Sequence, residues 1–127
     1  MADNLHNCTG TIGRKGEDSA SLYLTERGHT IIERNWRSGH LEIDIISLDK
    51  DGIHFIEVKT RRPPILLAPQ DCVTYKKQKN ITTAAKRYLA GHDFGDIECH
   101  FDILAIIIDK DKTVYRYIQD AFIPVYV

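Results

Sequence analysis

The spacing of apolar and polar residues predicts a chain that mixes helices with strands. Residues 11–27 carry an apolar face at helical spacing, which includes Ala20 and Leu24, and Gly28 suits the position just past a helix end. A second helical stripe covers residues 73–90. Runs rich in β-branched and aromatic residues predict five strands, over residues 30–36, 41–48, 53–60, 101–108 and 114–118. The predicted order is therefore helix, three strands, helix, two strands.

The second and third predicted strands carry charged residues at alternate positions. Glu42 and Asp44 lie two apart, as do Glu57 and Lys59, so each pair shares one face of its strand. A four-residue loop at 49–52 places Asp44 opposite Glu57, and Glu42 opposite Lys59. A two-residue turn inside that loop would instead place Asp44 opposite Lys59. Either even-length loop brings all four charges to one face of the hairpin.

The electrostatics of that face predict a metal site. Opposed carboxylates repel each other across a sheet, and a divalent cation such as Mg²⁺ removes the conflict because it takes oxygen ligands. A lysine beside the metal can orient an attacking water or stabilise charge on a phosphate. Asp44, Glu57 and Lys59 are therefore candidates for a phosphodiester-cleaving site. The alternative is two solvated strand faces whose charges pair across the hairpin.

Composition favours one globular domain that does not span a membrane. The 127 residues are 43% hydrophobic and 28% charged, and no apolar run reaches the roughly 18 residues that a membrane span requires. We expect residues 1–10 to be flexible and residues 11–127 to form a single endonuclease-like domain. The polar N-terminus lacks an apolar signal core, and the three cysteines are scattered, so we expect a cytoplasmic protein.

The charge distribution permits contacts with nucleic acid. A net charge of −1 excludes a strongly basic protein that coats DNA. Basic residues nevertheless cluster at residues 59–62 and 76–79. Arg61 and Arg62 directly follow the candidate site strand, and Lys77 lies on the second helix, so these three are candidates for contact with phosphates. The alternative for Lys77 is a packed stem with its charge in water.

Several motifs together resemble a known family. The chain resembles the YraN-type family of small bacterial proteins, which is similar to archaeal Holliday-junction resolvases and so to the restriction-endonuclease-like superfamily. The matching segments are Gly13-Arg14-Lys15-Gly16-Glu17, Arg34-Asn35-Trp36-Arg37, Glu42-Ile43-Asp44, Phe55-Ile56-Glu57-Val58-Lys59-Thr60-Arg61, Val73-Thr74 with Lys77, Ala85, Tyr88-Leu89 and Phe101-Asp102. The resemblance covers about residues 10–110.

That resemblance implies a fold, an activity and a site. The fold is an α/β restriction-endonuclease-like core of order αβββαβ, with a central mixed sheet flanked by helices. The activity is that of a metal-dependent nuclease of the Holliday-junction-resolvase type, which hydrolyses phosphodiester bonds in branched DNA and acts as a homodimer. Asp44 and Glu57 would bind Mg²⁺ or Mn²⁺, Lys59 would be the catalytic lysine, and Glu17 would be a further acid of the site.

Other readings of the chain remain open. It departs from the family pattern at Leu41 and Leu67, where members usually have glycine, and the added bulk is expected to narrow nucleic-acid access. One alternative function is a non-catalytic nucleic-acid-binding module with the same fold. Another is a small interaction protein that docks a partner through its apolar loop at residues 65–67. Glu42 is either a site residue or a salt-bridge partner, and Asp102 is favoured as a structural hydrogen-bonding residue over a metal ligand.

Overall fold

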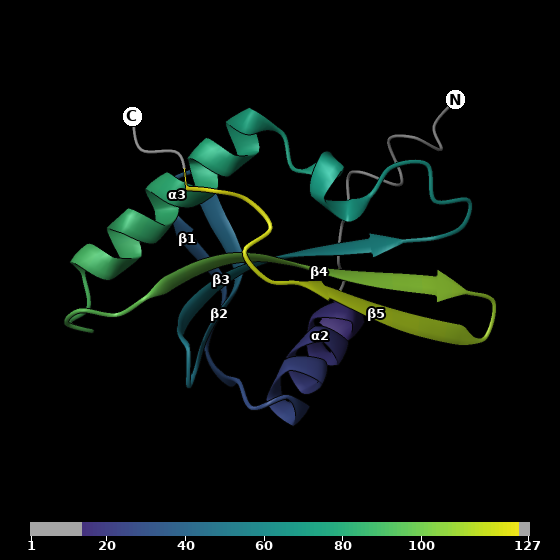
Figure 1. Cartoon of the computed structure of the whole chain (residues 1–127), viewed down its shortest axis with the longest axis horizontal. Helices are drawn as coiled ribbons and strands as arrows, with labels where there is room; N and C mark the ends of the chain where they lie inside the picture. The colour runs from purple at the N-terminus through teal and green to yellow at the C-terminus, as the bar shows by residue number, and fades with distance from the viewer. Residues whose placement is uncertain (1–13, 125–127) are drawn as a thin grey trace.

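The computed structural model describes residues 14–124, which form a five-stranded sheet with one long helix on each side (Figure 1). The elements are α2 (Arg14–Glu26), β1 (Thr30–Ser38), β2 (Leu41–Asp49), β3 (Gly52–Arg61), η1 (Pro69–Cys72), α3 (Tyr75–Ala90), β4 (Cys99–Asp109) and β5 (Lys112–Ile118). The predicted order of helices and strands is confirmed. The expectation of flexibility for residues 1–10 lies outside the described residues.

The strand order follows the sequence, as β1-β2-β3-β4-β5. β3 and β4 are parallel, and every other neighbouring pair is antiparallel. Parallel neighbours need a long crossover connection, and α3 supplies it. The result is the predicted α/β core of order αβββαβ, a mixed sheet flanked by helices, with β5 added at one edge.

Two apolar clusters cover the two faces of the sheet. The cluster beneath α3 includes Phe55 of β3, and the cluster beneath α2 includes Ile56 and Val58 of the same strand. Because successive side chains of a strand point to opposite faces, odd-numbered residues of β3 face α3 and even-numbered residues face α2. This alternation decides which polar residues of β3 can meet.

The β2–β3 hairpin has the first of the two registers considered above. The pairs run from Asp49 opposite Gly52 to Ile45 opposite Ile56, and Asp44 and Glu57 are the next residues beyond the last pair. Gly52 has a φ of +139°, and a Cβ there would lie 2.2 Å from the Glu98 carbonyl oxygen. Glycine therefore allows β3 to begin against this backbone, where the Ile53 amide donates to the same oxygen at 2.9 Å.

The predicted boundaries differ most at the connection between β3 and α3. Residues 69–72 form a short 3₁₀ helix that the proline-rich sequence did not predict. α3 then begins at Tyr75, two residues later than expected, because the Thr74 side chain caps it by accepting from the Lys77 amide at 3.2 Å. The apolar tip at residues 65–67 is exposed, by 40–48%. No helix in the described part of the chain is long and apolar enough to cross a membrane.

Candidate active site

Asp44 lies where the pairing of β2 with β3 ends. One of its carboxylate oxygens, Oδ2, accepts a hydrogen bond from the Val58 amide at 2.8 Å, so a side chain takes the role of a ladder carbonyl. Alternation along β2 also breaks here. Ile43 and Ile46, three residues apart, both join the cluster beneath α3, whereas Ile45 joins the cluster beneath α2. This irregularity turns Asp44 toward β3.

The Asp44 carboxyl group meets that of Glu57. Glu57 is buried, at 8% exposure, on the face of β3 toward α3. Burial raises the pKa of Asp44 well above its usual range, and the hydrogen bond and negative charge of Glu57 raise it further. Two acids this close repel each other when both are ionised, so a nearby positive charge stabilises the pair.

Lys77 supplies a positive charge beside this pair. It lies in the first turn of α3, and its Nζ is 3.3 Å from Oε2 of Glu57. The Lys77 side chain is 44% exposed, so the ion pair lies at the mouth of the site. The structure therefore brings Asp44, Glu57 and Lys77 together, and gives Lys77 an acidic partner that the sequence did not predict.

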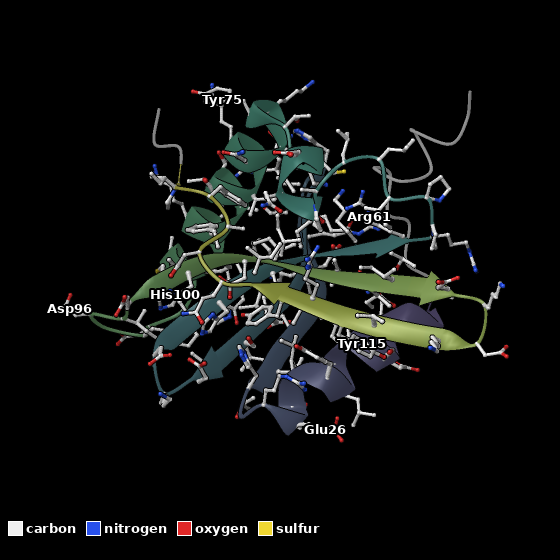
Figure 2. The ribbon with its side chains drawn as sticks, turned by 45° about the vertical axis from the view of Figure 1, so that its right-hand side comes forward. Glu26, Arg61, Tyr75, Asp96, His100 and Tyr115 are labelled. Carbon is white, nitrogen blue, oxygen red and sulfur yellow. The ribbon has the colours of Figure 1, made fainter. Side chains whose placement is uncertain are left out.

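The basic residues that follow Glu57 are divided between the interior and the surface. Lys59 and Arg61 share the face of Glu57 and are buried, at 6% and 1% exposure. Figure 2 shows Arg61 on the same side of the sheet as Tyr75 of α3. Within the described part of the chain, the Nε, Nη1 and Nη2 atoms of the Arg61 guanidinium have no hydrogen-bond partner. Arg62 is exposed. Arg61 and Arg62, predicted as equivalent phosphate contacts, therefore occupy different environments.

Glu17 contacts β1, the strand that neighbours the Asp44 strand. It accepts a hydrogen bond from the Asn35 side chain, and its Oε2 lies 3.9 Å from a guanidinium nitrogen of Arg34. Asn35 lies between the β1 residues that pair with Ile43 and Ile45, and so faces Asp44 across the strands. Glu17 therefore contacts β1 beside the residues that pair with the two neighbours of Asp44.

The structure also shows the surroundings of Glu42, Leu41 and Leu67. Glu42 pairs with Arg37, at 3.2 Å between Oε2 and Nη2, which is the salt-bridge alternative. Leu41 is only 5% exposed and belongs to the cluster beneath α3. The expectation that its bulk would narrow nucleic-acid access is therefore wrong, because the side chain fills the core. Leu67, by contrast, is 44% exposed.

The donor set at this site suits a hard divalent cation. Asp44 and Glu57 offer carboxylate oxygens from adjacent strands, and their mutual repulsion favours a positive ion between them. Mg²⁺ is commonly held by one or two carboxylates, with waters and substrate phosphate completing its coordination. The residues present therefore fit Mg²⁺ or Mn²⁺.

A second polar cluster, which sequence reasoning missed, lies on the opposite face of the sheet. His29, Asp49 and His54 place one potential metal-binding atom each within 4.8 Å of one another, and Asp102 contacts the same group. We call these four residues the histidine cluster. A signal for it exists in the sequence, because His54 and Asp102 are single polar residues within two apolar runs. That signal predicts a contact between the two residues only once the runs are known to be neighbouring strands.

Every hydrogen-bonding atom of the His54 ring has a partner. Nδ1 lies 2.6 Å from Oδ2 of Asp102, and Nε2 lies 2.8 Å from Oδ1 of Asp49. Asp102 also accepts from the Tyr117 hydroxyl and, at 2.8 Å, from the Asp120 amide. Burial alone would favour a neutral ring, but the hydrogen bonds to Asp102 and Asp49 raise the pKa of His54. The prediction that Asp102 is a structural hydrogen-bonding residue is confirmed.

Comparison with known proteins identifies the family. Residues 16–106 match the model of the family described as "Uncharacterised protein family UPF0102". A UPF0102 protein of Nitratidesulfovibrio vulgaris is 42% identical over 110 residues, covering 87% of this chain and 82% of the relative. One from Chlorobium phaeobacteroides is 45% identical over 96 residues, covering 76% of each chain. One from Rhodococcus opacus is 39% identical over 123 residues, covering 96% of this chain and all of the relative. The chain belongs to the UPF0102 family, the YraN-type family that its motifs resemble.

Proposed function

We propose that the protein is a metal-dependent nuclease of the Holliday-junction-resolvase type, which hydrolyses phosphodiester bonds in branched DNA. One observation carries the proposal. The carboxyl groups of Asp44 and Glu57 meet from adjacent strands, and Lys59 is buried two residues further along the same face of β3. Two opposed acids followed by a lysine are an unfavourable core but a workable phosphodiesterase site.

Each group has a role in this reaction. When bound, Mg²⁺ or Mn²⁺ supplies a Lewis acid and lowers the pKa of a coordinated water. Asp44 and Glu57 would hold it through their oxygens. Lys59 is placed to orient the attacking water or to neutralise charge that develops on the phosphate. Glu17 would act indirectly, by holding Asn35 across from Asp44.

Positive charge near the acids supports binding of an anionic backbone. Lys77 is partly exposed at the mouth of the site, and Arg62 is exposed just past the end of β3. The Arg61 guanidinium, which has no hydrogen-bond partner among the described residues, adds positive potential behind Lys59. A DNA strand that placed one phosphate at Asp44 and Glu57 would have Lys77 beside it, because Lys77 pairs with Glu57 and is partly exposed.

Two contacts favour a second candidate, a non-catalytic nucleic-acid-binding module. The Lys77–Glu57 ion pair and the hydrogen bond between Glu57 and Asp44 satisfy the acids by mutual pairing. In a binding module these contacts would be permanent, and the basic residues would hold nucleic acid without hydrolysis. In a nuclease, metal and substrate would replace them.

A cleavage assay with a matched control separates the two candidates. Purified protein is incubated with end-labelled four-way, flap, duplex and single-stranded DNA in Mg²⁺ or Mn²⁺, beside the Asp44→Ala and Glu26→Gln variants. Glu26 is an exposed acid near the end of α2, on the other side of the sheet from Arg61 (Figure 2). We expect cleavage by the wild type and by Glu26→Gln, and none by Asp44→Ala.

Other outcomes of the assay are equally informative. Metal-independent binding without cleavage on every substrate would favour the binding module. Equal cleavage by wild type and Asp44→Ala would contradict this site assignment. A four-way junction needs two cuts, so the resolvase version also expects a homodimer, and sedimentation showing only monomer at assay concentration would contradict that version.

A further inference from the structure

The histidine cluster brings together three potential metal ligands from separate segments. His29 follows the end of α2, Asp49 ends β2, and His54 lies in β3 on the face toward α2. Their candidate ligand atoms all lie within 4.8 Å of one another. Glu57 faces α3 instead, so this group lies on the other side of the sheet from the candidate active site.

Both imidazole rings present the same nitrogen to Asp49. Nε2 of His54 is 2.8 Å from Oδ1 of Asp49, and Nε2 of His29 is 3.6 Å from Oδ2. The other ring nitrogens are already held, with Nδ1 of His29 2.8 Å from the Ser47 hydroxyl and Nδ1 of His54 2.6 Å from Asp102. Metal-binding histidines are held in this way, with one ring nitrogen on the metal and the other on a neighbouring polar group.

The spacing suits a four-coordinate ion. Zinc bonds to nitrogen and oxygen of about 2.0–2.2 Å place tetrahedral ligand atoms about 3.3–3.6 Å apart. Nε2 of His29 lies 3.6 Å from Oδ2 of Asp49, within that range, and the 2.8 Å between Nε2 of His54 and Oδ1 would widen when an ion replaces the hydrogen bond. His29 and His54 are buried, whereas the Asp49 side chain is 14% exposed, so the cluster reaches solvent at Asp49.

We propose that His29, Asp49 and His54 form a binding site for a transition-metal dication, with Zn²⁺ as the first candidate and water as a further ligand. Two imidazoles and one carboxylate suit Zn²⁺, whereas Mg²⁺ prefers oxygen alone. The ion takes the place of the proton shared by His54 and Asp49, and that proton is released to solvent. The bound ion ties the connection after α2 to the β2–β3 hairpin. The proposal does not depend on nuclease activity.

The first test is a calorimetric titration of tag-free, chelator-treated, full-length protein with Zn²⁺. We expect the Asp49→Asn and His29→Gln variants each to weaken binding by at least about tenfold. His92→Gln is the matched control, because His92 is an exposed histidine at the end of α3. It should bind Zn²⁺ as the wild type does. Equal Zn²⁺ affinity in the wild type, Asp49→Asn and His29→Gln, or no binding by the wild type, would overturn the proposal.

A second variant tests positioning without removing a ligand. Ser47→Ala removes the partner of Nδ1 of His29, and we expect it to weaken Zn²⁺ binding about 10- to 100-fold. Circular dichroism and urea unfolding in chelator check that each variant is folded. Zn²⁺ binding that is lost in Asp44→Asn but kept in Asp49→Asn would place the ion at the other site and overturn the proposal.

Co²⁺ provides a spectroscopic readout that is independent of affinity. A tetrahedral Co²⁺ site absorbs strongly in the visible range, and octahedral Co²⁺ in water absorbs weakly. We expect the wild type and His92→Gln to show the strong bands, and Asp49→Asn to lose them. Strong bands of unchanged intensity in Asp49→Asn would also overturn the assignment.

Discussion

β3 contributes to two polar sites that differ in how well their charges are matched. On the face toward α3, the Asp44 and Glu57 carboxyls meet, with Lys77 paired to one of them from the rim. On the face toward α2, both ring nitrogens of His54 contact carboxylates, and Asp102 has three hydrogen-bond partners. The first site contains a conflict of like charges, and the second is a closed network.

The difference separates a site whose like charges require a cation or a proton from one whose side chains are held by hydrogen bonds before any ion binds. Opposed carboxyls destabilise a buried site until a cation or a proton intervenes, whereas a satisfied network makes the interior more specific. The ligand types differ as well, because one site offers only oxygen and the other offers imidazole nitrogen. We therefore expect mutations in the first to alter activity and mutations in the second to alter stability and metal selectivity.

The largest effect is expected from Asp102→Ala. This change leaves His54 and the Tyr117 hydroxyl without their buried partner, and loss of such a partner costs about 3–5 kcal/mol of unfolding free energy. Urea unfolding monitored by circular dichroism measures the cost. Asp96→Ala, at an exposed loop position (Figure 2), is the control and should change stability by less than about 0.5 kcal/mol. Equal stability of both variants would show that the network does not hold the fold.

The next largest effect is expected at the candidate active site, on the face of the sheet toward α3. Lys59→Ala should lower the cleavage rate about 10²- to 10³-fold, because it removes a positive group placed to act on the phosphate. The measurement is single-turnover cleavage of the best substrate, with DNA affinity determined separately. Lys110→Ala, at the exposed β4–β5 turn, is the matched control and should cleave normally. An unchanged rate in Lys59→Ala would remove the lysine from the mechanism.

The pH dependence of stability tests whether hydrogen bonds in the histidine cluster stabilise the fold. Hydrogen bonds to Asp102 and Asp49 raise the pKa of His54 above the ordinary value of 6.5, so the folded state holds this proton more tightly than the unfolded chain. The stabilisation is complete below pH 6.5 and is lost as the pH rises through the pKa of the folded protein. In chelator, the unfolding free energy should therefore fall between neutral and alkaline pH.

Two neighbouring histidines also titrate, so the contribution of His54 must be separated from theirs. The pKa of His100 is also raised, through its bonds to Asp120 and the Asp51 carbonyl, and contributes in the same direction. Burial and the nearby His54 lower the pKa of His29, which weakens stability only at pH below 6.5. Asp49→Asn should flatten the alkaline fall by removing one carboxylate from His54. An unchanged profile in that variant would assign the fall to His100.

The smallest effect is expected at Glu42. Glu42→Gln removes a surface ion pair with Arg37, whose side chain is 71% exposed, so the loss should be below about 1 kcal/mol. Cleavage should be unchanged, because Glu42 forms an ion pair with Arg37 at the surface. A strong loss of cleavage would show that Glu42 belongs to the active site, which would then extend along β2.

The order of elements was predictable from local pattern, whereas the β2–β3 register was only narrowed to two alternatives with an even-length loop. Alternating charges in Glu42, Asp44, Glu57 and Lys59 required an even-length loop, and the observed pairing, from Asp49 with Gly52 to Ile45 with Ile56, meets that condition. The late start of α3 at Tyr75 was less predictable. The Thr74 cap competes there with an apolar stripe that would extend the helix further back.

The sequence by itself determined the family, the element order and the face on which Glu57 and Lys59 lie, because alternation along a strand is a local property. Only the tertiary structure decided that Lys77 meets Glu57, that Arg61 is buried whereas Arg62 is exposed, and that His29, Asp49 and His54 converge. These contacts join residues from different elements. They depend on how helices pack on the sheet and which strands are neighbours, and no local spacing in the chain encodes that geometry.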